Sequence, residues 1–268
     1  MTMISRHHVS VSGPRDAQPM LFGHGFGCDQ TMWRHVAPAF SDRYRVVTFD
    51  HMGSGGSDVS GYDPSRYEDL HGYASDVLEI VRELELSDVV FVGHSVSSMI
   101  GALAAIAAPE RFDALVMVSP SPRYIDDIDY RGGFAREDID ELLEALASNY
   151  LGWSSAMAPV IVGNPDRPAL GEELTASFCR MDPEIARQFA TTTFLSDNRE
   201  DLPKVAVPTL VLQCSRDAIA PTRVGRYVAD SVPDATFVQL AATGHCPNLS
   251  APEETIAAID DFLRRGET

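Results

Sequence analysis

The chain has 268 residues, of which 44% are hydrophobic, and this length and composition indicate one large globular domain. Acidic residues outnumber basic ones by 39 to 21, and the formal net charge of -18 makes a nucleic-acid backbone an unfavourable partner. No segment approaches the roughly 18 uninterrupted apolar residues of a membrane span, and the first residues lack the apolar core of a secretory signal. We therefore expect a cytoplasmic protein that binds neither nucleic acid nor membrane.

Short β-branched runs alternate with helical segments along much of the chain. The runs predict strands at residues 9–11, 20–23, 45–49, 89–92, 114–118, 209–214 and 236–240. Apolar residues at helical spacing predict helices at residues 67–85, 99–107 and 252–265. The central strands are apolar throughout, as in parallel strands that are buried on both faces. The pattern predicts an α/β fold with a mostly parallel central sheet and helices on both of its faces.

The alternation breaks between about residues 122 and 196, where no convincing strand appears. Four short helices are expected instead, at residues 136–150, 153–162, 171–179 and 183–194. Asp182-Pro183 is typical of a helix start, because aspartate caps the first turn and proline suits the first helical position. We interpret residues 123–195 as a helical lid inserted into a core of residues 1–122 and 196–268.

The predicted strand at 89–92 leads directly into Gly93-His94-Ser95-Val96-Ser97, and a helical stretch follows. Strand, sharp turn and helix are the setting of a nucleophile elbow, in which the turn presents a serine oxygen above the sheet. Small residues flank the nucleophile because the turn brings two backbones close together. The usual pattern G-x-S-x-G ends in glycine, and Ser97 stands there instead, nearly as small. The context predicts that Ser95 is a nucleophile.

A serine hydroxyl needs a base to remove its proton. His245 follows Gly244 just after the last predicted strand, and Asp217 follows the strand at 209–214. With eight histidines in the chain, one histidine alone is uninformative, and an aspartate after a strand is also consistent with a simple turn or cap. The order Ser95, Asp217, His245 nevertheless matches the Ser…Asp…His order of one hydrolase fold. We predict that these residues are nucleophile, orienting acid and general base.

His24-Gly25-Phe26-Gly27 follows the strand at 20–23. Glycines there allow the loop to turn its backbone N–H groups inward, although a plain glycine-rich turn has the same composition. We expect the amides of Phe26 and Val96 to form an oxyanion hole.

Three segments carry a resemblance to a known family. They are His24-Gly25-Phe26-Gly27-Cys28-Asp29-Gln30, Asp50-His51-Met52-Gly53-Ser54-Gly55 and Gly93-His94-Ser95-Val96-Ser97. They resemble the RsbQ-type bacterial stress regulators and the plant karrikin and strigolactone receptor hydrolases, which belong to the α/β-hydrolase superfamily. Further matches to the RsbQ type extend the resemblance to about residue 250. Ser97 matches the plant form of the elbow better than the general one, and the choice between the two branches stays open.

The resemblance implies an α/β-hydrolase fold with a four-helix lid over a mainly apolar pocket. It also implies a role in sensing and signalling with slow hydrolysis as the chemistry. For the RsbQ type, it implies a sensory phosphatase as partner.

The expected pocket is apolar because the lid is rich in aromatic residues. The resemblance favours Phe26, Phe134, Trp153 and Phe194 as substrate-binding residues, and Met157, Phe189 and Cys246 complete the predicted set. Apolar residues on short helices are also typical of core packing, and Cys246 would serve equally as a small buried filler. Apolar walls with few polar anchors suit a compact, uncharged molecule, and an ester or lactone fits because serine attack at a carbonyl needs no cofactor.

Two functions follow from these features. The first is an esterase or lactonase that acts on a small apolar substrate. The second is a non-enzymatic ligand-binding regulator that contacts a phosphatase through its lid. Haloalkane dehalogenases and epoxide hydrolases need aspartate at the elbow, where Ser95 stands. No metal is expected, because the sequence has no HExxH or comparable cluster and its four cysteines show no CxxC spacing.

Overall fold

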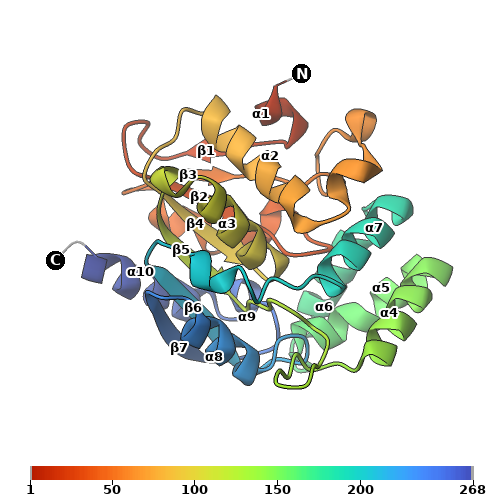
Figure 1. Ribbon diagram of the computed structural model, residues 1–268. Helices are drawn as coiled ribbons and strands as arrows, with labels where there is room; N and C mark the ends of the chain where they lie inside the picture. Colours follow the sequence, from red (N-terminus) through yellow and green to blue (C-terminus); the bar gives the residue numbers. More distant parts are fainter. Residues whose placement is uncertain (1, 267–268) are drawn as a thin grey trace.

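The computed structural model describes residues 2–266, whose arrangement is shown in Figure 1. Within this range a seven-stranded sheet has the order β1-β3-β2-β4-β5-β6-β7. The strands are β1 (Ser10–Ser12), β2 (Pro19–Gly23), β3 (Arg45–Thr48), β4 (Val89–His94), β5 (Phe112–Val118), β6 (Thr209–Arg216) and β7 (Ala235–Thr243). At the edge, β1 pairs antiparallel with β3, and the other described pairings are parallel. The predicted mostly parallel sheet is confirmed.

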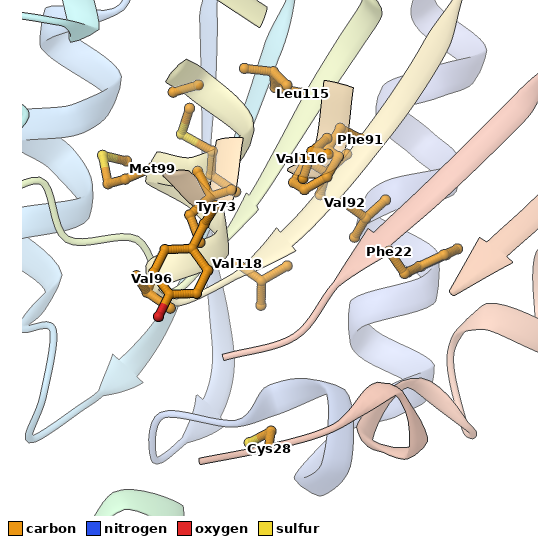
Figure 2. Packing of buried hydrophobic residues seen from close by; sticks show 14 of the residues in the cluster. Phe22, Cys28, Tyr73, Phe91, Val92, Val96, Met99, Leu115, Val116 and Val118 are labelled. Atoms are coloured by element: carbon orange, nitrogen blue, oxygen red, sulfur yellow. The ribbon is translucent and has the colours of Figure 1, made fainter. Parts of the chain in front are cut away.

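The central strands lie in the hydrophobic core. Every residue of β2 and β4 is buried, and Leu21 pairs with Phe91, which pairs with Leu115 on β5. Figure 2 shows Val92, Val118 and their neighbours packed around these strands. Since helices cover both faces, the strands need no polar side, which explains their uninterrupted apolar sequence.

Helices cover the sheet on both faces. In Figure 1, α2 (Leu70–Glu83), α3 (Val96–Ala107) and α8 (Thr222–Ser231) lie in front of the sheet, and α10 (Pro252–Gly266) lies behind it. Two single-turn helices, α1 (Met3–Arg6) and α9 (Pro247–Ser250), are also present. The 3₁₀ turns are η1 (Gln30–Trp33), η2 (Ala37–Phe40), η3 (Val59–Gly61), η4 (Pro64–Tyr67), η5 (Pro109–Arg111) and η6 (Leu202–Lys204).

Four helices fill the interval between β5 and β6. They are α4 (Arg136–Ser148), α5 (Tyr150–Val162), α6 (Pro168–Phe178) and α7 (Pro183–Phe194), and they gather beside one end of the sheet (Figure 1). The Asp182 carboxylate accepts hydrogen bonds from the N–H groups of Glu184 and Ile185, which explains why α7 begins at Pro183. No strand forms within this interval, as the sequence predicts.

The main differences from the predicted elements lie at helix boundaries. The helix expected at 67–85 is α2, which begins only at Leu70, because the Asp69 side chain caps its start by accepting from His71 N–H. Helix α3 begins at Val96, three residues earlier than expected. Helix α8 was not predicted, because only Val224, Gly225 and Val228 form its buried face. Among the described residues, no helix is long and apolar enough to cross a membrane.

Candidate active site

The loops after four parallel strands meet at one edge of the sheet. β2 leads to Phe26, β4 to Ser95, β6 to Asp217 and β7 to His245. Parallel strands place their carboxyl ends on the same side, so residues far apart in sequence come together here.

Ser95 occupies the turn between β4 and α3 with φ of 56° and ψ of -122°. This is an uncommon conformation for a residue with a Cβ, and such strain costs about 1–3 kcal/mol. Its N–H donates to the carbonyl of Val118 at 2.8 Å, which ties the turn to β5. A Cβ on Gly93 would clash with the Ser97 backbone, so the close approach of strand and helix requires glycine there.

His245 lies between Ser95 and Asp217. Its Nε2 is 2.8 Å from Ser95 Oγ, and its Nδ1 is 2.7 Å from Asp217 Oδ2. An ionised carboxylate only accepts hydrogen bonds, so Nδ1 carries the proton and Nε2 is free to accept one from the serine. All three residues are buried, with 6%, 3% and 8% of Ser95, His245 and Asp217 exposed.

The Asp217 carboxylate is held in its ionised form. Its Oδ1 accepts from the N–H groups of Ile219 and Ala220 at 2.8 and 3.0 Å, and its Oδ2 also accepts from Gln213 Nε2 at 3.3 Å. Burial works to raise the pKa of Asp217, but His245 and the two N–H groups outweigh burial and lower this pKa below its ordinary value. The carboxylate therefore stays charged and keeps the imidazole oriented.

The two amides predicted to form an oxyanion hole belong to Phe26 and Val96. Val96 is the first residue of α3, and the first N–H groups of a helix have no acceptor within it. In the described part of the chain, the Phe26 N–H donates no hydrogen bond. Both donors are thus available to a ligand.

A narrow cavity of about 30 Å³ adjoins Ser95 and His245. Its wall is mostly apolar and comes from both the sheet loops and the helices between β5 and β6. The lining residues are Phe26, Cys28, His94, Ser95, Tyr124, Ile161, Leu174, Phe178, Thr193, Phe194, Ile219, His245 and Cys246. A wider surface depression of about 580 Å³ is lined by Asp217 but not by Ser95.

Of the predicted pocket residues, Phe26, Phe194 and Cys246 line this cavity. Phe134, Trp153, Met157 and Phe189 are not among its lining residues, and their part in substrate binding stays a prediction. The Phe189 ring is fully buried and stacks on Tyr73 at 4.4 Å between centroids. The Trp153 ring packs edge-on against Phe178 at 5.4 Å. Phe134 and Met157 are half-buried and pack against the core.

Several wall residues were missed because composition alone does not tell which side of a short helix faces the cavity. Tyr124 and Phe178 are aromatic residues of the lid segment, but the predicted set of substrate-binding residues does not include them. Burial raises the pKa of Tyr124 to about 12, so its phenol stays neutral beside Ser95. Cys28 was not selected either, although it lies two residues beyond Phe26. Burial keeps the pKa of the Cys28 and Cys246 thiols well above the ordinary range.

The geometry suits nucleophilic attack by a serine. Hydrogen bonds connect the Ser95 hydroxyl to the His245 imidazole and the imidazole to the Asp217 carboxylate. Among residues 2–266, no group of three or more His, Cys, Asp or Glu side chains is placed to hold a metal ion.

The parallel sheet, the strand–turn–helix serine and the Ser…Asp…His order define a protein of the α/β-hydrolase class. Residues 20–258 match the model of the Alpha/beta hydrolase family, and the chain belongs to this family.

Relatives in the same family include receptors and enzymes. The chain is 41% identical over 254 residues to Karrikin insensitive 2 receptor CA of Petunia hybrida, covering 94% of each chain. It is 39% identical over 259 residues to a strigolactone esterase of Arabidopsis thaliana, covering 96% of this chain and 95% of that one. Among solved structures, a hydrolase from Oleispira antarctica superposes with a TM-score of 0.95 at 36% identity, covering 98% and 96% of the two chains. The resemblance to karrikin and strigolactone receptor hydrolases is confirmed, and these relatives support hydrolase activity.

Proposed function

We propose that this protein is a serine hydrolase of small, uncharged, apolar carboxylic esters or lactones. The observation that carries the proposal is the continuous chain of contacts from Ser95 Oγ to His245 Nε2 at 2.8 Å and from His245 Nδ1 to Asp217 Oδ2 at 2.7 Å. The esterase name of one relative supports the same class of substrate.

The proposed reaction has two stages. Ser95 Oγ attacks the substrate carbonyl carbon while His245 Nε2 takes the hydroxyl proton, and Asp217 stabilises the imidazolium that forms. The N–H groups of Phe26 and Val96 stabilise the negative oxygen of the tetrahedral intermediate. The intermediate collapses to an acyl-enzyme, and the alcohol oxygen leaves with the proton from His245. Water, activated by the same histidine, then releases the acid and restores Ser95.

We assign a lid function to residues 123–195. The helices α5, α6 and α7 contribute Ile161, Leu174, Phe178 and Phe194 to the cavity wall, so they cover Ser95. Ligand pockets for small organic molecules usually measure about 300–1,000 Å³, far more than the cavity described here. Substrate entry therefore requires these helices or their side chains to move.

A panel of p-nitrophenyl esters and lactones tests the hydrolase assignment. Wild-type protein should turn over short apolar members, and intact-mass spectrometry should detect an acyl adduct on Ser95. The Ser95→Ala variant is the matched control. Turnover that survives in a folded, uncontaminated Ser95→Ala preparation would contradict the proposal.

A second function is favoured by the relative that is named a receptor. In this alternative the protein senses a signal molecule, as in the RsbQ type, and its lid contacts a sensory phosphatase. Helix α4 offers a surface for such a contact, since Glu137, Asp140 and Glu141 are exposed on it. Charged surface groups act mainly through complementarity with a partner.

Charge reversal on α4 distinguishes the two functions. E137K and E141K should leave kcat/KM unchanged in either case, because neither residue lines the cavity. If the protein is a regulator, the same variants should lose phosphatase binding and a cellular stress-response signal. Normal phosphatase binding and signalling in these variants would show that this face of α4 is not the contact surface.

A further inference from the structure

Ser97 is the residue that departs from the usual glycine of the elbow, and its side chain has two hydrogen-bonding partners. The residue is fully buried. Its hydroxyl donates to the backbone carbonyl of His24 at 2.5 Å, and it lies 2.6 Å from His51 Nε2. These contacts connect the beginning of α3 with the loops that follow β2 and β3.

The Ser97 hydroxyl has one proton, so it donates only one of its two hydrogen bonds. Because Ser97 donates to a carbonyl, which only accepts, its oxygen must accept from His51 Nε2–H. His51 is then a neutral imidazole with an unprotonated Nδ1, and this atom is buried without a partner in the described residues. Burial, with smaller contributions from His24 and His7, lowers the pKa of His51 well below its ordinary value, consistent with a neutral ring.

The same reasoning shows which ring nitrogen of His24 carries the proton. The backbone N–H of His51 donates to His24 Nε2 at 2.9 Å, so this nitrogen carries no proton. His24 Nδ1 therefore carries the proton and donates it to the Gly25 carbonyl at 2.8 Å. The N–H of Cys28 donates to the same carbonyl at 3.2 Å.

The direction of the Gly25 carbonyl decides the direction of the next amide. In a trans peptide, C=O and N–H lie in one plane and point in opposite directions, and the described residues include no cis peptide bond. His24 Nδ1–H and the Cys28 N–H fix the direction of the Gly25 carbonyl, so they also make the Phe26 N–H point in the opposite direction. Phe26 lines the cavity beside Ser95, and this free N–H is on the same residue.

We propose that Ser97 and His51 are positioning residues of the oxyanion hole, which hold the loop of residues 24–27 so that the Phe26 N–H faces the reacting carbonyl oxygen. This inference rests on the proposed serine-hydrolase function. Neither side chain touches the substrate. The Ser97 hydroxyl acts through the His24 backbone carbonyl, and the His51 side chain acts through Ser97. Serine at position 97 thus supplies a hydroxyl that the usual glycine lacks.

The Ser97→Ala variant removes this hydroxyl with little change in volume. Loss of a whole oxyanion-hole donor slows a hydrolase by about 100- to 1,000-fold, and misorientation of one should cost part of this, about 10- to 100-fold in kcat. KM should change by less than about threefold, because the lost interaction forms mainly in the transition state. An arylboronic acid, which forms a tetrahedral adduct with Ser95, should lose affinity in parallel with kcat/KM.

Two further variants separate positioning from general packing. Ser98→Ala is the matched control, because Ser98 is also buried and its hydroxyl donates to the Gly93 carbonyl at 2.9 Å. It should lower thermal stability without the selective loss of kcat. His51→Phe keeps an aromatic ring against Phe49 and Tyr73 but removes the donor, and combined with Ser97→Ala it should cost little beyond either single change.

Nitrogen NMR of histidine-labelled protein gives a readout that is independent of turnover. His51 should appear as the Nε2–H tautomer and His24 as the Nδ1–H tautomer, and the His51 signal should shift in Ser97→Ala. A folded Ser97→Ala variant with wild-type kcat and boronate affinity would overturn the inference, as would the opposite tautomer of His51. If Ser95→Ala is inactive while Ser97→Ala is unimpaired, the positioning inference alone fails. If Ser95→Ala retains activity, the proposed function itself fails.

Discussion

The backbone N–H of His245 donates a hydrogen bond of 2.9 Å to the carbonyl oxygen of Ile161, near the end of α5. The residue in the position of the base is therefore attached to a helix that also walls the cavity. Nearby, Asn164 Nδ2 donates to the carbonyl of Thr243 at 2.9 Å. The helical segment and the histidine loop are thus joined by two contacts.

We predict that Asn164→Ala loosens the histidine loop. Asn164 is buried, and its loss leaves the Thr243 carbonyl without this donor, so the free energy of unfolding should fall by about 1–3 kcal/mol. The kcat for an activated ester should fall as well, because His245 becomes less well oriented. Urea denaturation and steady-state kinetics measure the two effects. Ser155→Ala, an exposed change in α5, is the control and should affect neither.

We predict that Ser95→Ala abolishes ester hydrolysis and leaves the fold intact. The hydroxyl supplies chemistry, and alanine at φ of 56° is no worse than serine in backbone strain. A fluorophosphonate should label the wild-type protein at Ser95 and fail to label the variant. Peptide mapping that places the label on another serine would contradict this assignment of the nucleophile.

We predict that Asp217→Asn lowers kcat by up to about 10⁴-fold, because a neutral amide does not stabilise the imidazolium and favours the wrong tautomer of His245. Steady-state kinetics at pH 8 measure the loss, and circular dichroism checks the fold. Asp201→Asn, a change to a carboxylate that binds Lys204 outside the cavity, is the control. A variant that keeps more than about a tenth of the wild-type kcat would mean that another group orients the base.

We predict that the protein loses stability as the pH falls below about 6.5, the ordinary value for histidine. Burial lowers the pKa of His24 and His51 in the folded state and lowers that of His94 to about 3. In this pH range the unfolded chain binds protons that the folded chain does not, so stability is complete above pH 6.5 and declines towards acid.

Urea denaturation at pH 7.5, 6.0 and 5.0 measures this dependence. The free energy of unfolding should fall by at least about 1.4 kcal/mol per pH unit between pH 6 and 5, the value for one proton. His35→Gln, which changes an exposed histidine, should leave the slope unaltered. Equal stability at all three pH values would show that these histidines become protonated in the folded protein.

The sequence predicts the sheet and the Ser95, Asp217 and His245 positions well, for a physical reason. Buried parallel strands must be continuously apolar, and the loops at their carboxyl ends then carry the polar residues. The structure brings the three side chains into contact, while their catalytic roles remain to be tested by the variants above.

The cavity wall is harder to predict. Phe189 and Phe178 lie on neighbouring short helices with similar sequences of apolar residues, yet Phe178 faces the cavity and Phe189 stacks on Tyr73. The choice depends on how each helix rotates against the core, which its own sequence does not fix. The Ser97–His51 contact is a similar case, because its partners are 46 positions apart and meet only in the folded chain.

The composition of the cavity wall bears on what happens after the reaction. In the proposed reaction, hydrolysis turns an uncharged ester into a carboxylate, and an ionised carboxylate is costly to retain among rings and thiols without a charged partner. The net charge of -18 adds a repulsion of the same sign. The site thus distinguishes its ligand before and after cleavage by a single negative charge, and the acid should be a poor competitive inhibitor. If the protein is a sensor, release of the acid after cleavage would return it to the ligand-free state and end the response.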